Sequence, residues 1–497
     1  MDILQKTLLA KYDPKGFFPN LLTLFFPLSI GMGILAGYLI VKFDQPIAIL
    51  ISLFGMVLFF VSIFYVEFGL LILVFITYTR FSDVVIQYHG APSVAKFFIV
   101  LLVLSILMRW ALFREQPKGW ITLAILLGIY GLVGFASLIY SPVPSRVWGG
   151  VLDYAKDAII AIVVVVLLQT RITFHRTLWV MMVAGMFLAS LTVIQYFTKT
   201  YDNNYGGFAI TGMHQIVGEN DEYRVGGPLE DPNFFAQILV VLVPISLERF
   251  LHEKKNRYKL IALYSTLVTI LCLLLTYSRG GFLALVAALG VYFYYYPPKR
   301  IQLPIIIIVG LLFFAAAPPR YVDRIFTLTE FLQSKTTLRT SERSFQGRIS
   351  ENLAAWEMIK AQPLFGVGLR SYNYLFPIYS KNLGLALVAG EREAHNLYLE
   401  ITAETGIVGL LVFMTIVYTS IKALRQARRR FILRRMPEYA SMTTGYLAGF
   451  AGYMVAALFI HGAYPRYLYL MIGIACSLIL VSKDGEGSRL SGPGRLG

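Results

Sequence analysis

The sequence has few charged residues and almost no cysteine. Of its 497 residues, 14% are Asp, Glu, Lys or Arg and 57% are hydrophobic. A soluble globular protein carries about a quarter charged residues, so the composition excludes that class and indicates a chain that crosses a membrane several times. The two cysteines, Cys272 and Cys476, lie in apolar stretches, so we expect free buried thiols and no disulfide.

Motifs for nucleotide and metal chemistry are also missing. The chain has no Gly-rich phosphate-binding loop, no Asp-x-Asp pair for a metal-bound nucleotide sugar, and no histidines at the spacing of metal ligands. We therefore expect no metal and no cofactor. The formal charge of +16 does not point to a nucleic-acid partner, because the basic residues collect in short loops between apolar segments.

Apolar segments define the predicted fold, since a membrane span needs about 20 mostly apolar residues. The third and eleventh of these segments are short, so we predict an all-α polytopic membrane protein with about 12–14 transmembrane helices. They form one integral membrane domain over 1–497. The segments lie at about 21–41, 46–64, 67–79, 94–113, 119–140, 151–169, 177–197, 233–249, 260–278, 281–297, 303–317, 396–421, 441–461 and 466–482.

Basic residues predict the orientation of these segments. With a cytoplasmic N-terminus, the loops after the even-numbered segments carry most of the Arg and Lys residues to the cytoplasmic side, including the run Lys422–Arg435. Both termini are then cytoplasmic. Two long loops, 198–232 and 318–395, lie on the outer, periplasmic side. The basic run could also contact anionic headgroups, so membrane lipids are expected partners.

The larger loop contains a predicted amphipathic helix. Four apolar residues recur at spacings of four, four and three, which places them on one helical face: Phe345, Ile349, Leu353 and Trp356. We predict a helix over 345–361 that lies in the membrane interface. Pro363 ends it, and Gly366 and Gly368 form a tight turn.

Arginines near the outer ends of the segments are candidate anion-binding residues. One arginine guanidinium can bind two phosphate oxygens at once, and it keeps its charge where the dielectric constant is low. The alternative is a set of surface charges that reach toward water. The candidates are Arg224, Arg279, Arg348, Arg370 and Arg466. Asp231, just after Arg224, reads as the N-cap of the eighth segment.

His395 is the candidate proton acceptor, although a lone histidine is more often structural. It lies directly before the twelfth segment, where a neutral imidazole could accept a proton from an attacking hydroxyl. Asn396 could fix the ring. Glu400 and Glu404, four residues apart on one helical face, could orient a donor sugar or pair with an arginine.

In their order and spacing, these motifs resemble the O-antigen ligase and O-antigen polymerase superfamily over roughly 230–410. The resemblance implies a GT-C-like, metal-independent membrane glycosyltransferase of the bacterial inner membrane. Such enzymes take a glycan from an undecaprenyl-pyrophosphate carrier at the periplasmic face. Ligases pass it to lipid A-core, and polymerases pass it to another lipid-linked glycan. The motifs are Ser278–Leu283, Gly347–Arg348, Pro363–Gly368, His395–Asn396 and Glu404-x-Gly406-x-x-Gly409.

The resemblance also assigns roles. Arg279 and Arg348 would hold the pyrophosphate, and His395 would activate the acceptor hydroxyl, with inversion at the anomeric carbon. The remaining candidates would bind substrate: Arg224, Arg370, Asn396, Glu400, Glu404 and Arg466. We expect a ligase, with a polymerase as the alternative because it differs only in its acceptor. A lipid-glycan transporter would need charged or broken helices near mid-membrane, and a passive scaffold would tolerate loss of both Arg279 and His395.

Overall fold

The computed structural model describes residues 65–217, 220–300, 343–383, 390–462 and 465–483. Almost all of them belong to the second of two compact units, Leu70–Gly497. The segments expected at 21–41, 46–64 and 303–317 lie outside the described residues.

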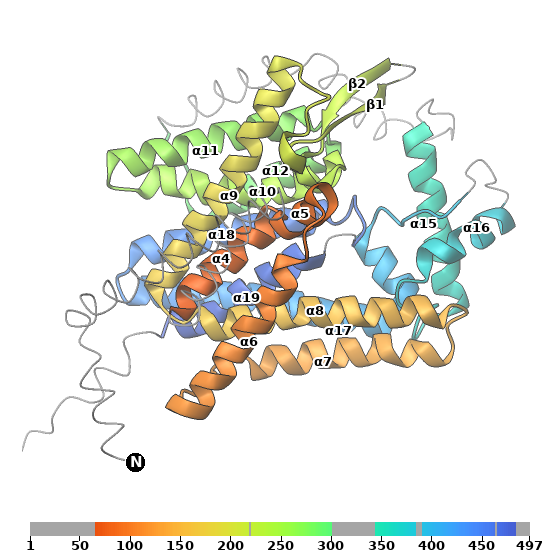
Figure 1. The fold of residues 1–497 in the computed structure, drawn as a ribbon, viewed down its shortest axis with the longest axis horizontal. Helices are drawn as coiled ribbons and strands as arrows, with labels where there is room; N and C mark the ends of the chain where they lie inside the picture. Colours follow the sequence, from red (N-terminus) through yellow and green to blue (C-terminus); the bar gives the residue numbers. More distant parts are fainter. Residues whose placement is uncertain (1–64, 218–219, 301–342, 384–389, 463–464, 484–497) are drawn as a thin grey trace, which may run out of the picture. The chain divides into compact units, whose positions relative to one another are not determined.

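Helices account for nearly all of the described chain, which confirms the all-α class (Figure 1). They are α4 (Val66–Tyr78), α5 (Phe81–His89), α6 (Val94–Phe113), α7 (Ile121–Ala136), α8 (Pro144–Leu167), α9 (Arg171–Thr198), α10 (Pro232–His252), α11 (Asn256–Leu275), α12 (Arg279–Tyr295), α15 (Arg343–Ala361), α16 (Tyr372–Asn382), α17 (Leu397–Leu433), α18 (Pro437–Ala456) and α19 (Pro465–Val481). Short 3-10 turns are η1 (Ser137–Ile139), η2 (Tyr205–Gly207) and η3 (Gly227–Leu229). An antiparallel hairpin, not expected from the sequence, joins β1 (Thr211–Val217) to β2 (Asn220–Val225).

Six described helices are long and apolar enough to cross a membrane, so the protein is a multi-pass membrane protein. They are α6, α7 with η1, α9, α10, α11 and α17, and a seventh span results if α4 and α5, bent by 56°, are one span. α12 and α19 are shorter apolar helices. α8 is outside this set, and it carries Asp153, Lys156 and Asp157 within its length. The predicted total of 12–14 spans stays a prediction.

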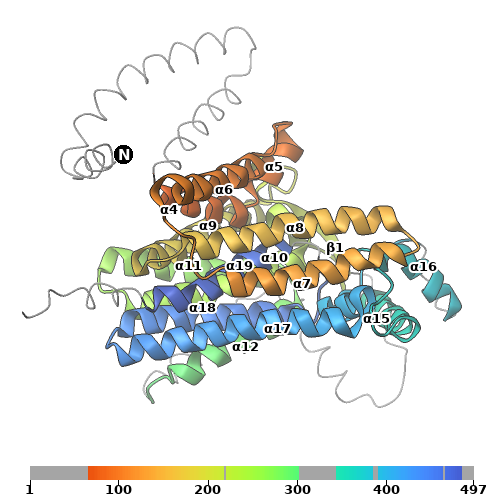
Figure 2. The same ribbon diagram turned by 90° about the horizontal axis from the view of Figure 1, so that it is seen from below.

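α10 is the most deeply buried of these helices, since 83% of its most apolar 18-residue stretch is buried inside the protein. It packs against α11, α12 and α18. α18 approaches closely because small residues face α10: a Cβ added at Gly449 would lie 2.5 Å from the carbonyl oxygen of Val241. α7 packs against both α8 and α17, and α15 and α16 lie at one end of these helices (Figures 1 and 2).

α17 is longer than the segment predicted at 396–421. Its 37 residues continue through the basic run that the sequence assigns to a loop. The helix persists because these basic side chains find partners on neighbouring helices: the Arg428 Nε donates to Thr444 Oγ1 at 2.9 Å, and its guanidinium lies 4.2 Å from the ring centre of Tyr295. Arg430 Nη1 donates to the carbonyl oxygen of Ile479 at 3.2 Å.

α15 confirms the helix predicted over 345–361. Its face of small side chains, Ala354 and Ala355, is buried with Met358 in a cluster that includes residues of α16. Two residues of the predicted apolar stripe, Leu353 and Trp356, are exposed on the opposite face. α15 therefore buries its small residues against protein and presents its large apolar residues outward.

The turn after Pro363 fits into a break in α17, where Gly406 has φ 68° and ψ −173°. The break frees backbone carbonyls, and the turn supplies the donors: Val367 N donates to Ala403 O at 2.8 Å, and Gly368 N donates to Glu404 O at 2.9 Å. Ile407 N donates back to Pro363 O at 2.9 Å. The predicted tight turn is confirmed, with positive φ at Gly366 and Gly368.

Gly366→Ala should destabilise the fold. Gly366 has φ 71°, and an added Cβ would overlap the backbone of Glu404. We expect a loss of about 2 kcal/mol or more in the free energy of unfolding. Thermal unfolding in detergent measures it. Gly290→Ala in α12 is the matched control, since its Cβ meets nothing within 4 Å. Equal melting temperatures for the two variants would contradict the prediction.

Candidate functional site

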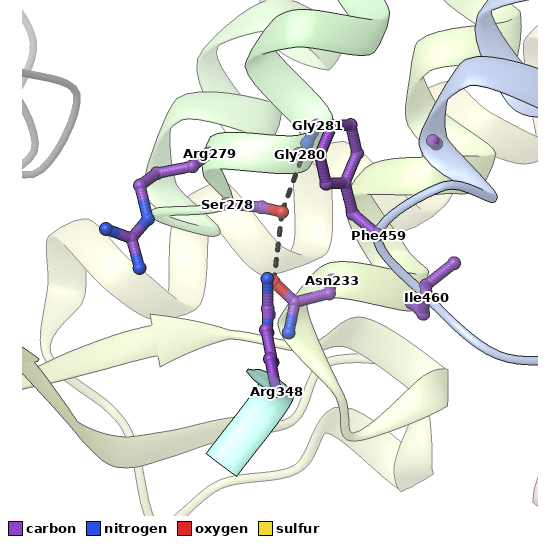
Figure 3. Close-up of a pocket in the computed structure, with 9 residues that line it drawn as sticks. Asn233, Ser278, Arg279, Gly280, Gly281, Arg348, Phe459 and Ile460 are labelled. Atoms are coloured by element: carbon purple, nitrogen blue, oxygen red, sulfur yellow. Dashed lines mark hydrogen bonds between the residues drawn. The ribbon is translucent and has the colours of Figure 1, made fainter. Parts of the chain in front are cut away.

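One pocket of the described chain brings together the two arginines predicted to hold an anion (Figure 3). The side chain of Arg279 comes from the start of α12, and that of Arg348 extends from α15 toward Asn233 and Ser278. The other walls come from the first turns of α10 and α12 and from the connection between α18 and α19. The lining residues are Asn233, Ser278, Arg279, Gly280, Gly281, Arg348, Ala456, Phe459 and Ile460.

Asn233 is held in place by hydrogen bonds from two directions. Its Oδ1 accepts from Ser278 Oγ at 3.0 Å and from Arg224 Nη2 at 3.3 Å. Arg224 also donates through Nε to the carbonyl oxygen of Thr276 at 2.8 Å, and it is buried. The structure therefore places Arg224 behind the pocket, where it supports Asn233 and the end of α11.

Local capping explains why these residues stand at helix starts. Asp231 Oδ1 accepts from the amides of Asn233 and Phe234 at 2.7 and 3.1 Å, so the predicted N-cap of α10 is confirmed. Ser278 caps α12 and accepts from Gly281 N at 3.2 Å. Arg279 is then the first residue of a 17-residue helix, whose dipole favours an anion beside its side chain.

His395 is held by two acceptors. Its Nδ1 lies 3.1 Å from Glu351 Oε2 and 3.1 Å from the carbonyl oxygen of Glu393. Glu351 is buried and also pairs with Arg392, whose Nη1 lies 3.5 Å from Oε1. The sequence did not identify Glu351. The available signal was its position three residues after Arg348, which puts both side chains on one side of α15.

These contacts fix the proton on the imidazole. The carbonyl oxygen of Glu393 can only accept a hydrogen bond, and the Glu351 carboxylate lies within ion-pair distance, so Nδ1 carries the proton in the neutral ring and Nε2 keeps its lone pair. Burial alone lowers the pKa of His395. The charge and hydrogen bond of Glu351 outweigh burial and raise that pKa above its usual value. His395 is thus a stronger base than an ordinary histidine.

Asn396 forms the N-cap of α17. Its Oδ1 accepts from the amides of Tyr398 and Leu399 at 3.0 and 3.1 Å and caps α17. His395 itself has φ 45°, a left-handed conformation that turns the chain into the cap. The left-handed turn at His395 orients its imidazole, and the cap formed by Asn396 begins α17.

His461 is a second histidine that the sequence reading missed. It follows Phe459 and Ile460 of the pocket, and its ring centre lies 5.4 Å from that of His395. Burial, followed by the positive charges of His395 and Arg370, lowers the pKa of His461 to about 3. The site therefore holds two adjacent histidines with opposite protonation tendencies.

A comparison with family models matches part of the chain. Residues 264–414 match the family described as O-antigen ligase. This stretch is similar to O-antigen ligases. It includes Arg279, Arg348 and His395, so the resemblance predicted from the motifs is confirmed, and together with the apolar helices it supports a membrane glycosyltransferase of the O-antigen ligase or polymerase type. A comparison with curated proteins finds no match.

Glu400 and Glu404, both within the matched stretch, accept hydrogen bonds from backbone amides of neighbouring segments. Glu400 Oε2 accepts from the amide of Gly462 at 2.7 Å, next to His461. Glu404 Oε1 accepts from the amide of Tyr372 at 3.1 Å, at the start of α16. Glu400 thus fixes the connection that carries His461, and Glu404 fixes the start of α16.

The remaining predicted arginines lie apart from the pocket lining. Arg370 is exposed, with φ 59°, and its charge acts on His461 and Glu393. Arg466 lies 3.4 Å from Asp83 and 3.5 Å from Asp157, in ion pairs that join α19 to α5 and α8. Of the two, only Arg370 lies where its charge reaches the histidines. Among the described residues, no group of three or more His, Cys, Asp or Glu could hold a metal ion.

Arg146 is another residue that the sequence did not single out. Its two terminal nitrogens donate to the carboxylate of Glu391 at 2.6 and 3.0 Å, and its guanidinium lies over the ring of Tyr374. A bidentate pair of this kind fixes orientation as well as distance. It ties the segment before His395 to the start of α8.

Glu351→Gln should lower the pKa of His395. The amide keeps the shape of the side chain but removes the charge that favours the imidazolium. NMR titration of protein labelled with ¹³C-histidine, in detergent micelles, measures the pKa directly. Glu357→Gln is the control, since Glu357 lies on the same helix and pairs with Lys360. An unchanged His395 titration in Glu351→Gln would show that the carboxylate does not control the imidazole.

Proposed function

We propose that this protein is an O-antigen ligase. It transfers a glycan from an undecaprenyl-pyrophosphate carrier to a hydroxyl of lipid A-core, without a metal or other cofactor. One observation carries the proposal: α15 delivers Arg348 to the pocket of Arg279 and, one turn later, delivers Glu351 to His395. α15 thus carries one residue of the anion site and the carboxylate that pairs with the proposed base.

The charges that line the pocket suit a pyrophosphate leaving group. Arg279 and Arg348 supply two fixed positive charges, and the start of α12 adds its helix dipole. As the glycosidic bond breaks, negative charge grows on the departing pyrophosphate. Cations already in position stabilise that charge without reorganising. The donor needs no nucleotide, because the lipid pyrophosphate is itself the activated group.

His395 is the proposed proton acceptor. The acceptor oxygen attacks the anomeric carbon and gives its proton to Nε2 of His395, while the bond from the carbon to the pyrophosphate oxygen breaks. The bonding electrons leave with the pyrophosphate, and attack from the opposite side inverts the anomeric centre. Glu351 stabilises the imidazolium that forms, as a carboxylate does for histidine bases in general.

A polymerase is the alternative, and it would use the same pocket and the same base. The two differ in the acceptor, which is lipid A-core for a ligase and a second lipid-linked glycan for a polymerase. The description of the matching family favours the ligase.

The proposed location is the bacterial inner membrane, with the site on the periplasmic side and both termini in the cytoplasm. α17 supports this orientation, because His395 precedes its first turn and the basic residues Arg428 and Arg430 lie near its last. Basic residues favour the cytoplasmic end of a span. In the proposed organisation, 1–497 is one membrane domain and 198–232 and 318–395 are its periplasmic loops.

Arg279→Ala, Arg348→Ala and His395→Ala should each abolish glycan transfer in a deletion strain. Losing a fixed charge or a general base costs about 100-fold or more in rate. Electrophoresis of surface glycans reads the result. Bare lipid A-core with polymerised glycan left on its carrier indicates a ligase, and core capped by one repeat unit indicates a polymerase. Arg109→Ala is the control, since Arg109 pairs with exposed Glu115. Normal ladders from all three variants at normal protein level would refute the assignment.

Glu351→Gln should move the acid limb of the pH–rate profile to lower pH. Transfer needs neutral His395, so the rate falls as pH drops through the His395 pKa, which Glu351 raises. Without the carboxylate that pKa is lower, and the neutral base persists to lower pH. The maximal rate should also drop, because the imidazolium loses its partner. A lower rate with an unmoved acid limb would assign Glu351 a structural role only.

A further inference from the structure

His461 is a half-buried histidine that the proposed mechanism does not use. Its Nδ1 is buried and has no hydrogen-bond partner in the part of the chain that the structure describes. Buried polar atoms in native proteins are nearly always satisfied, so an unpartnered one calls for an explanation. A ligand that hydrogen-bonds the ring is one explanation, and the position of His461 supports it.

The groups around His461 come from α10, from α17 and the turn before it, and from the turn before α16. Phe234 of α10 packs edge-on against the ring with its centre 4.9 Å away, and His395 stands before α17. Glu400 of α17 holds the next residue through the amide of Gly462. Arg370, before α16, adds a positive charge. These surroundings hold the imidazole in a fixed place and favour its neutral form.

The neutral form determines what His461 can bind. A neutral imidazole donates one hydrogen bond and accepts another, as a sugar hydroxyl does. Phosphate recognition is already provided by the cations of Arg279 and Arg348. The centres of the two imidazole rings lie 5.4 Å apart. Since a hydrogen bond to oxygen spans about 2.8 Å, one sugar can contact both rings.

We infer that His461 is a substrate-binding residue that hydrogen-bonds an oxygen of the acceptor sugar beside the hydroxyl that His395 deprotonates. This inference rests on the proposed function and extends it. His395 accepts the proton, and His461 binds the sugar whose hydroxyl donates it. Pairs of titratable groups whose surroundings push their pKa values apart commonly divide roles in this way.

The test is steady-state transfer by the detergent-solubilised full chain. Donor and acceptor are the lipid-linked glycan and the core glycolipid extracted from membranes of the source bacterium, each varied in turn. His461→Ala should raise the KM for the acceptor about tenfold, the loss of one hydrogen bond, and leave the KM for the donor unchanged. His461→Asn keeps a neutral hydrogen-bonding group and should recover part of the loss. His89→Asn is the control, since His89 is exposed and its Nε2 lies 3.1 Å from the carbonyl oxygen of Gly206.

The outcomes separate this inference from the proposed function. An unchanged acceptor KM in His461→Ala, or a rise in the donor KM alone, overturns the inference. The acid limb of the rate profile should stay in place in His461→Asn, and a shift would overturn the division of roles. If His461→Ala does not fold, His461→Asn and His461→Gln decide through the same KM comparison. Full activity of His395→Ala would instead refute the mechanism on which the inference depends.

Discussion

The contact between Glu351 and His395 is the interaction on which the site depends. A carboxylate that is 1% exposed needs a partner of opposite charge, because burying an unpaired charge is costly. His395 and Arg392 supply that charge from the segment that leads into α17. The pair therefore joins α15 to the segment that leads into α17, and through Arg348 it sets how far the imidazole stands from the pocket of Arg279. Charge pairing and the geometry of the site are here one constraint.

Much of this arrangement could be predicted from local sequence patterns. Apolar runs indicated the helices, and the four-four-three spacing indicated α15. The Asp231 cap and the turn at Gly366 followed from residue preferences that act over a few positions. Arg279, Arg348 and His395 were identifiable because a charge beside an apolar segment stands out against its surroundings. Each of these signals lies within one turn or one segment of the residue it marks.

The residues that the sequence missed all depend on partners far along the chain. Glu351 pairs with a histidine 44 residues away, and His461 meets His395 across the connection between α18 and α19. Arg146 reads as an ordinary helix-end charge until Glu391 is placed beside it. The extension of α17 was missed for the same reason, since Thr444 and Tyr295 keep Arg428 on a helix. Tertiary partners, which one sequence does not display, override local preference.

α17 connects the site to the far ends of its neighbours. Beyond the break at Gly406, residues 407–433 rise about 1.5 Å each and span about 40 Å, more than the thickness of a bilayer core. Its first turn is capped next to His395, and its last turns are clamped by Arg428 and Arg430. A rod anchored at both ends transmits displacement along its axis. Gly406 is the one break inside it, so motion between the two membrane faces either passes through the whole helix or is absorbed at that residue.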